Sequence, residues 1–376
     1  MSTFRTPVSI IREINPHPNA TALDYAKVYD FDVIVKKDSY KVGDTILYVP
    51  VDAILPTWLE CRLFPIDSKI RLTKSRVRQI RIRGHASQGM VVNLSDIRDK
   101  VSGELEEGQD LAEVLGITKY EPPAPTFQEN GPRVKKERNR SYDNPYFHQY
   151  GGLENAKWYP DLFVEGQEVV YQVKIHGTNF RASMSPYVPV TMWEKIKNFF
   201  KLLPSHQFCF GSNCVQLQSK AKEYTGYYQE NIYAKIAKEY ELEKKLKPNE
   251  TVYGEVYGPG IQKGYDYGVP NGELRLAVFD VKVLSEDRQS TRWLSVDELT
   301  AWCKERDLEM VPILYRGPHN KDLAKQYTLG DCIGGQKVRE GIVIRDPLET
   351  VCFMGKKVIK LISEDFLDNK NNTDFH

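Results

Sequence analysis

The sequence is short of paired cysteines and of long apolar runs, and each shortage excludes a class of protein. Its 376 residues include six cysteines, and no two of them form a Cys-x-x-Cys pair. His206, Cys209 and Cys214 lie close together, but no second ligand cluster completes a zinc-finger pattern. We therefore expect free thiols in a reducing compartment rather than a disulfide framework.

Long apolar runs are missing as well. No run of about 18 apolar residues predicts a membrane span. The first twelve residues lack the profile of a signal peptide. From these absences we expect a soluble intracellular protein, cytoplasmic or nuclear, without a membrane partner.

The chain also lacks a charge excess of either sign. It has 52 Lys and Arg against 51 Asp and Glu, for a net charge of +1, so a protein that binds nucleic acid must concentrate its basic residues locally. One short segment is dense in basic residues and admits two interpretations, contact with a phosphate backbone or a solvated charged face. Its members are Arg71, Lys74, Arg76, Arg78, Arg81 and Arg83.

Composition changes along the chain predict three parts. Residues 1–118 carry short strand patterns, such as 32–35 and 45–49, between frequent turn signals, which fits a small β-barrel. Residues 119–150 are first rich in proline and then polar and basic, which predicts a linker. In residues 151–376, strand patterns alternate with helical ones, and no internal repeat is found.

Two helices are expected in this last part. Residues 227–247 carry apolar side chains at helical spacing and predict one long helix. Residues 190–203 predict a second, amphipathic helix through Trp193, Ile196, Phe199 and Phe200. Such a pattern is also typical of a membrane-surface helix, but we expect this one to pack against its own domain.

One lysine stands out in the string Val-Lys-Ile-His-Gly-Thr-Asn-Phe, residues 173–180. The preceding residues 168–173 alternate and are rich in β-branched side chains, so they predict a strand that ends at Lys174. An amine held there faces the adjacent cleft. If the cleft is partly dry and carries other cations, the neutral and nucleophilic amine is favoured. An ordinary surface lysine before a β-turn is the alternative for an isolated Lys-x-His-Gly.

The longer string resembles motif I of the covalent nucleotidyltransferases, in the Lys-x-His-Gly-Thr-Asn form of the ATP-dependent RNA ligases. DNA ligases and capping enzymes usually carry Asp at the position of His176. Candidates for the later motifs follow in family order. Motif III matches residues 251–258 around Glu255, motif IIIa matches 274–280 with Phe279, motif IV matches 339–345 with Glu340, and motif V matches 358–361 with Lys360.

The resemblance implies a role for each of these residues. Lys174 would attack the α-phosphate of ATP and carry AMP, and Lys360 would contact the same phosphate. Glu340 would position a hydrated Mg²⁺ or Mn²⁺, and Glu255 would contact the ribose or the metal shell. Phe279 would stack on adenine. The alternatives are an exposed strand lysine for Lys360, a structural salt bridge for the carboxylates and core packing for Phe279.

Three further residues are weaker candidates for nucleotide binding. Asn179 and Arg181 follow the turn and could contact the nucleotide or a 5′-phosphate, or simply cap the turn. Val173 stands where many RNA ligases carry Glu, so only its backbone could contact adenine.

The resemblance also implies an α+β fold and an activity. The fold would be a nucleotidyltransferase domain (ATP-grasp-like antiparallel sheets with flanking helices) in residues 151–376, behind an all-β OB-type barrel in residues 1–118 that clamps nucleic acid. The activity would be ATP-dependent sealing of 3′-OH/5′-phosphate breaks in RNA, mainly duplex nicks, by a monomer. A DNA ligase, a capping guanylyltransferase and a non-catalytic nucleic-acid-binding protein of this fold are the alternatives.

Overall fold

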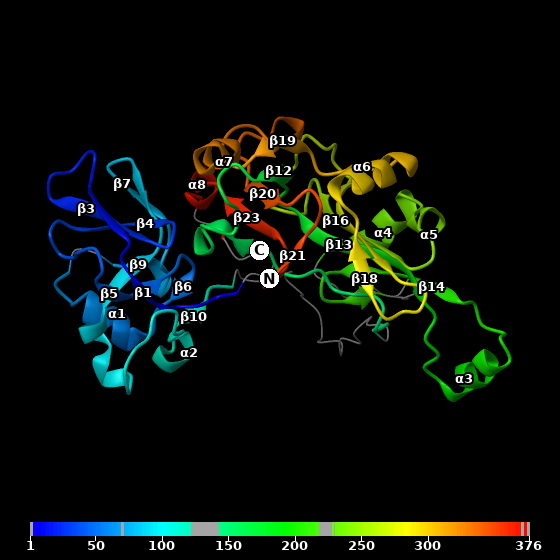
Figure 1. Cartoon of the computed structure of the whole chain (residues 1–376), viewed down its shortest axis with the longest axis horizontal. Helices are drawn as coiled ribbons and strands as arrows, with labels where there is room; N and C mark the ends of the chain where they lie inside the picture. The colour runs from blue at the N-terminus through cyan, green and yellow to red at the C-terminus, as the bar shows by residue number, and fades with distance from the viewer. Residues whose placement is uncertain are drawn as a thin grey trace, which may run out of the picture.

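The computed structural model describes residues 3–68, 71–121, 143–217, 228, 230–369 and 372–373. Figure 1 shows a β-rich N-terminal unit beside a larger unit built on two sheets. The α+β class predicted from the sequence is confirmed. No helix in the described ranges is long and apolar enough to cross a membrane.

The N-terminal unit is built on two three-stranded sheets with the orders β1-β5-β9 and β2-β3-β4. Alternate residues of β3 are buried, so Ala26 and Val28 face a shared core. The predicted strands 32–35 and 45–49 lie in β4 and β5. The strands are β1 (Val8–Ile10), β2 (Glu13–Pro16), β3 (Leu23–Val28), β4 (Phe31–Lys36), β5 (Thr45–Val49) and β9 (Met90–Asn93).

Short elements complete this unit. A hairpin of two strands carries part of the basic segment, and β10 pairs with β6, so the unit extends to Lys119. The elements are β6 (Ala53–Ile54), α1 (Thr57–Leu63), β7 (Ile80–Ile82), β8 (His85–Ser87), α2 (Ala112–Leu115) and β10 (Thr118–Lys119).

The first sheet of the larger unit has the order β11-β23-β20-β12-β19. The strand predicted over 168–173 is β12, and its apolar back face packs on α7 (Lys321–Thr328) through Tyr171, Ile342 and Ala324. The strands are β11 (Glu154–Asn155), β12 (Glu168–Lys174), β19 (Ile313–Pro318), β20 (Gly341–Arg345) and β23 (Val358–Ile362).

The second sheet has the order β15-β14-β13-β16-β17-β18. Its largest core cluster joins these strands to α4 (Ile232–Glu239), α5 (Leu242–Lys245) and α6 (Val296–Glu305). The strands are β13 (Thr178–Pro186), β14 (His206–Ser212), β15 (Gln216–Leu217), β16 (Glu250–Tyr257), β17 (Arg275–Leu284) and β18 (Thr291–Trp293).

Both helix predictions need correction. The single helix expected over 227–247 is two helices, α4 and α5, because Glu241 between them takes a left-handed conformation with φ 49°; residues 227 and 229 lie outside the described ranges. The amphipathic helix is present as α3 (Met192–Phe199), but the predicted packing against the domain is wrong, since none of its residues is buried. Figure 1 shows α3 at the tip of a long projection.

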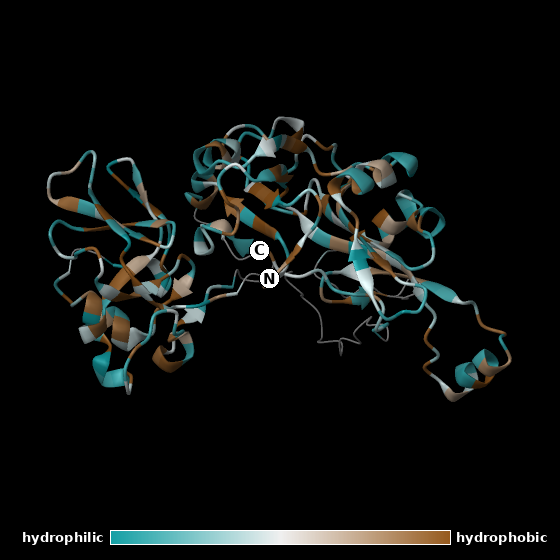
Figure 2. Cartoon of the chain, in the orientation of Figure 1, coloured by the Kyte–Doolittle hydropathy of each residue, from teal (hydrophilic) through white to brown (hydrophobic). Residues whose placement is uncertain are grey.

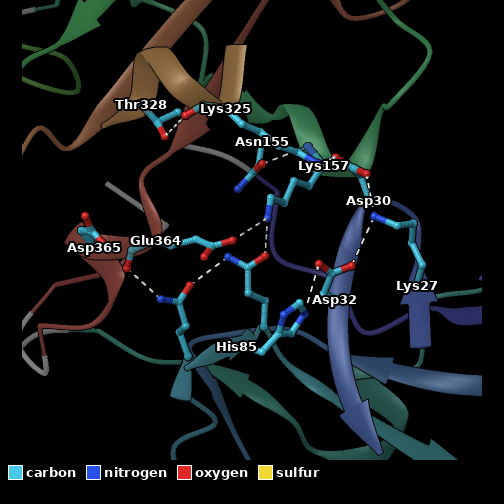
Figure 3. Close-up of polar contacts among 12 residues, drawn as sticks. Lys27, Asp30, Asp32, His85, Asn155, Lys157, Lys325, Thr328, Glu364 and Asp365 are labelled. Atoms are coloured by element: carbon cyan, nitrogen blue, oxygen red, sulfur yellow. Dashed lines mark hydrogen bonds and ion pairs between the residues drawn. The ribbon is translucent and has the colours of Figure 1, made fainter. Parts of the chain in front are cut away.

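The two units meet across a polar interface shown in Figure 3. The buried Lys157 ammonium contacts Gln88 Oε1 and lies 3.8 Å from Glu364 Oε1. Gln79 Nε2 donates to the carbonyl of Glu364, at the start of α8 (Glu364–Leu367), over 2.7 Å. Trp158 packs into the N-terminal core against Phe31. The interface therefore joins segments far apart in the sequence.

Only part of the linker predicted over residues 119–150 lies within the described ranges. Residues 122–142, which include the basic run 133–140, lie outside the described ranges. Residues 143–150 contact the second sheet: the backbone N–H of Asn144 donates to Gln216 over 2.8 Å, and the Tyr150 hydroxyl donates to Asp280 over 2.7 Å. This end of the interval packs as part of the larger unit.

Candidate active site

Lys174 ends β12 and faces a buried carboxylate. Its Nζ lies 2.5 Å from Oε1 of Glu340, which is 1% exposed. The pairing follows from register, because Lys174 lies opposite Gly341 in β20 and Glu340 directly precedes that strand. The two residues predicted at the centres of motifs I and IV are thus brought together, although 166 positions separate them.

Lys360 lies on the same face of this sheet. Gln172 is opposite Val343, and Val343 is opposite Lys360, so these three side chains share one face with Lys174, two residues beyond Gln172. Lys360 is 1% exposed, in the middle of β23. A buried lysine on the same face as Lys174 is not the exposed strand lysine of the alternative interpretation.

Glu255 approaches from the second sheet, on β16. Burial raises the pKa of Glu255 to about 8; the nearby Lys174 lowers it in part, and the Glu340 carboxylate raises it further. Oε2 of Glu340 is buried without a hydrogen-bond partner. Two crowded carboxylates with one unsatisfied oxygen leave an acceptor position that a bound cation could occupy.

A divalent cation with oxygen ligands fits this arrangement. The described residues contain no group of three His, Cys, Asp or Glu side chains that could hold a metal by themselves. Two carboxylates suit an ion such as Mg²⁺ or Mn²⁺, which keeps several waters and shares phosphate oxygens with a bound nucleotide. Glu340 and Glu255 are the residues that would hold it.

The turn after Lys174 lies against β16 and requires glycine. A Cβ atom on Gly177 would stand 2.4 Å from the carbonyl oxygen of Val256 and 2.8 Å from Cγ of Glu255. The Gln262 side chain donates to the Gly177 carbonyl over 2.8 Å. The glycine of the Lys-x-His-Gly string therefore sets the distance between the two sheets at the candidate nucleophile.

His176 is buried beside the same carboxylate. Its ring packs edge-on against Tyr265 and Phe366, with centroids 4.9 and 5.1 Å away, and its Nδ1 lies 3.7 Å from Glu340 Oε2. Burial, helped by the charge of Lys174, lowers the pKa of His176 to about 3. The imidazole is neutral at physiological pH and is part of the wall of the site.

Phe279, on β17, lies on the same face of the second sheet as Glu255 on the neighbouring strand β16. Glu255 pairs with Ala277, and Phe279 follows two residues later. The ring is partly buried, contacts the cluster of Val173 and Ile175, and meets Tyr150 edge-on at 4.9 Å. A partly buried aromatic on this face is placed where a base could stack.

The weaker candidates are placed differently from one another. Asn179 lies opposite Glu255 across β13 and β16, and its Oδ1 is buried without a partner. Arg181 is buried, donates to the carbonyls of Ser212 and Phe147, and stacks on the Phe147 ring at 3.8 Å. The Val173 N–H donates to the carbonyl of Pro312 over 2.9 Å. The Asn179 side chain could bind a ligand directly, whereas the Arg181 side chain and the Val173 N–H already make hydrogen bonds within the protein.

The basic segment is divided between internal and exposed roles. Arg76 forms a buried pair with Asp52 at 2.5 Å, Arg81 pairs with Asp365 and Asp368 of the other unit at 2.9 and 2.6 Å, and Arg71 donates to two carbonyls. Within the described part of the chain, the remaining three make no ion pair. These are Lys74, Arg78 and Arg83.

A buried charge network between the two sheets was not predicted from the sequence. Arg345 lies 3.1 Å from Asp280, also pairs with Glu349, and donates to the Phe279 carbonyl over 2.8 Å. Lys356 contacts both acids. Burial alone would raise the pKa of Asp280, but Arg345 and Lys356 lower it below the ordinary value. The sequence offered one signal for this network: the apolar stretches that match motifs IIIa and IV each end in a charged residue, Asp280 and Arg345 respectively.

Comparisons with known proteins agree with this architecture. The model of the RNA ligase family matches residues 167–362, and that of an OB-fold domain family matches residues 6–94. Solved structures of an RNA ligase from Naegleria gruberi are similar at 21% identity. A lysine-to-alanine mutant with ATP and Mn has a TM-score of 0.71 and covers 98% of this chain and 100% of that one. The complex with pyrophosphate has a TM-score of 0.70, with 98% and 99% covered.

Proposed function

This chain belongs to the RNA ligase family, and from that premise we propose that it seals 3′-OH/5′-phosphate breaks in RNA, chiefly nicks in a duplex, through AMP carried on Lys174. The observation that carries the proposal is the Lys174–Glu340 contact of 2.5 Å beside Glu255 and Lys360. That constellation unites a candidate nucleophile, a phosphate-binding cation and two metal-binding carboxylates in one place.

ATP and Mg²⁺ or Mn²⁺ are the proposed substrate and metal. The Naegleria gruberi ligase has been solved with ATP and Mn and with AMP and Mn, and the crowded carboxylates found here suit such an ion. When bound at Glu340 and Glu255, the metal would neutralise negative charge on the phosphates.

In the first step, the Nζ lone pair of the neutral Lys174 amine forms a bond to the α-phosphorus of ATP, the bond from that phosphorus to pyrophosphate breaks, and the nitrogen releases a proton to solvent. Glu340 holds the Lys174 side chain in position before the nucleotide arrives. Lys360, on the same sheet face, places positive charge where the α-phosphoryl oxygens gain negative charge. Phe279 provides an aromatic surface for the adenine, and Asn179 offers an unpaired oxygen to the nucleotide.

The two later steps move AMP and then release it. A 5′-phosphate oxygen of RNA attacks the lysyl phosphorus, the P–N bond breaks, and Lys174 leaves as the amine. The neighbouring 3′-OH then attacks the 5′-phosphorus, loses its proton and expels AMP. An N-terminal OB-fold unit beside the ligase unit supports the proposal that a duplex is clamped through its phosphates.

The first prediction tests the nucleophile. Lys174→Ala and Lys174→Arg should both abolish covalent attachment of AMP from labelled ATP, the second because guanidinium stays protonated. The exposed Lys238→Ala, in the same unit, is the matched control and should label normally. Labelled adenylate on either Lys174 variant would refute the assignment. Labelling from GTP instead would indicate a capping enzyme, and an unlabelled wild-type protein would indicate a non-catalytic binder.

The substrate is tested separately, on nicked duplexes with RNA or DNA on each side of the break. We expect sealing to require RNA at the break, and equal sealing of all-DNA nicks would favour a DNA ligase. Sedimentation of the enzyme alone should show the proposed monomer.

A further inference from the structure

The helix α3 presents an apolar face that nothing in the described structure covers. Its residues Met192, Trp193, Ile196 and Phe199 recur at helical spacing and share one side, and Phe200 extends it. These side chains are 43–81% exposed, and so are Val190 and Leu202 at the ends of the segment. In Figures 1 and 2 the helix stands at the tip of the projection from β13 and β14, away from both units.

Hydrogen bonds at the N-terminus of α3 stabilise the helix, and its apolar face takes no part in them. Thr191 and Glu194 form a capping box, and the Glu194 carboxylate also accepts the N–H of Val190 over 2.9 Å and the Tyr187 hydroxyl over 3.0 Å. These bonds lower the pKa of Glu194 to about 2. The apolar face is therefore displayed by a locally fixed helix rather than by a frayed end.

Lysines border the apolar face. At helical spacing, Lys195 and Lys197 lie on either side of it, and Lys201 follows just beyond the end of the helix. Three lysines against Glu194 give this segment a larger positive charge than the +1 of the whole chain. An aromatic and aliphatic face with flanking lysines matches the boundary of an anionic bilayer, where apolar side chains enter the acyl region and ammonium groups reach the headgroups.

We propose that α3 binds peripherally to a lipid surface that carries anionic headgroups. This goes beyond RNA sealing and departs from the expectation of no membrane partner. A second copy of the chain is a poorer occupant, because an eight-residue helix spans only about 12 Å and stable interfaces bury roughly 800 Å² per partner. RNA is a poorer occupant too: Trp193 and the two phenylalanines could stack on bases, but the aliphatic Met192 and Ile196 between them could not.

Flotation of the full-length protein with vesicles tests the proposal. The protein should float with phosphatidylcholine vesicles that contain phosphatidylglycerol and much less with phosphatidylcholine alone. The triple variant Trp193→Ser/Phe199→Ser/Phe200→Ser should lose at least about tenfold in bound fraction, and so should Lys195→Glu/Lys197→Glu, because both signals are needed. The matched control Ile66→Ser/Leu348→Ser removes two other residues that are 97% and 73% exposed and should float like the wild type.

Each contrary result overturns the proposal. Wild-type protein that stays unbound with both vesicle types refutes it, as does undiminished flotation of the triple variant. A dimer seen by sedimentation that the triple variant dissolves would identify a second copy as the occupant. Weaker RNA binding by the triple variant, with no vesicle effect, would identify nucleic acid. AMP attachment should be normal in all these variants, which separates this test from that of Lys174.

Discussion

At the scale of single residues, the site is defined by carboxylates and lysines buried together in a confined space. Glu340 is almost fully buried and pairs through one oxygen with Lys174, while its other oxygen has no hydrogen-bond partner. Glu255 stands close enough for its pKa to respond to both. Lys174 and Lys360 already match these two carboxylates in charge, so a further cation would serve to neutralise the phosphates of a bound nucleotide.

The pKa of Glu255 predicts how stability changes with pH. Its folded value of about 8 lies above the ordinary 4.5, so the folded protein retains a proton that the unfolded chain releases. In metal-free protein, the contribution of Glu255 to the free energy of unfolding should fall as pH rises from 4.5 to 8. Glu255→Gln should remove this dependence and raise the melting temperature at pH 8 by a few degrees.

Denaturant unfolding of the wild type and of Glu255→Gln, with a chelator present at pH 5 and at pH 8, measures this pH dependence. Glu243→Gln, on an exposed glutamate of the same unit, should leave the dependence unchanged. Adding Mn²⁺ should flatten the wild-type dependence, because the metal displaces the proton. An identical slope in wild type and Glu255→Gln would contradict the prediction.

His176 gives a second prediction at this scale. The neutral ring lies between Tyr265 and Phe366, with a carboxylate 3.7 Å away. His176→Asp would add an acid to a buried site that already holds Glu340, and it should cost about 1–3 kcal/mol at neutral pH. The cost should grow as pH rises, because the new carboxyl must ionise unfavourably. The neutral His176→Asn should lose less stability and show no such pH dependence. Chemical denaturation across pH separates the two, and equal curves would remove the charge argument.

At the scale of elements, the buried charge network fixes the two sheets to one another. Asp280 of β17 and Arg345 of β20 come from different sheets, and both are almost fully buried. Asp280→Ala would leave Arg345 and Lys356 to share the one buried carboxylate of Glu349 and should cost about 3–5 kcal/mol. Lys247→Ala breaks an exposed pair with Glu305 and should change stability by less than about 1 kcal/mol. Urea denaturation measures both changes in stability. A similar small effect for each variant would show that the network contributes little to the free energy of unfolding.

Local patterns predicted individual strands but not the partners of exposed faces. The alternating, β-branched residues 168–173 predict a strand, and β12 is that strand, although it is buried on both faces. The amphipathic pattern of 190–203 reports a helix with one apolar face but not what covers it, so the packing prediction failed. The break between α4 and α5 depends on one backbone conformation at Glu241, which side-chain periodicity does not encode.

The candidate site residues Lys174, Glu255, Glu340 and Lys360 were named because their motifs resemble, in family order, those of the ATP-dependent RNA ligases. A charged residue beside an apolar strand was not a sufficient signal by itself. Arg81 was a candidate for phosphate contact or for a solvated charged face on its charge alone, yet its partners Asp365 and Asp368 lie 284 and 287 positions away. A local sequence pattern carries no information about contacts between residues so far apart in the chain.

At the scale of the whole molecule, the interface of the two units should matter for sealing more than for AMP attachment. Lys174 and its neighbours all lie in the larger unit, whereas a clamp needs both units in a fixed relation. Removing residues 1–118 would test this poorly, because it also strips Trp158 of its core and Lys157 of Gln88. A point variant at the interface is cleaner.

Arg81→Glu is that variant, since it reverses a charge that faces Glu364, Asp365 and Asp368. Like-charge repulsion should open the interface, increase the radius of gyration in small-angle scattering and slow nick sealing at least about tenfold, with AMP attachment within about twofold of wild type. Arg83→Glu, two residues away and without an ion pair among the described residues, is the matched control and should leave the radius unchanged. If Arg81→Glu slowed AMP attachment and sealing equally, the N-terminal unit would have to act in the first step, and the clamp would be refuted.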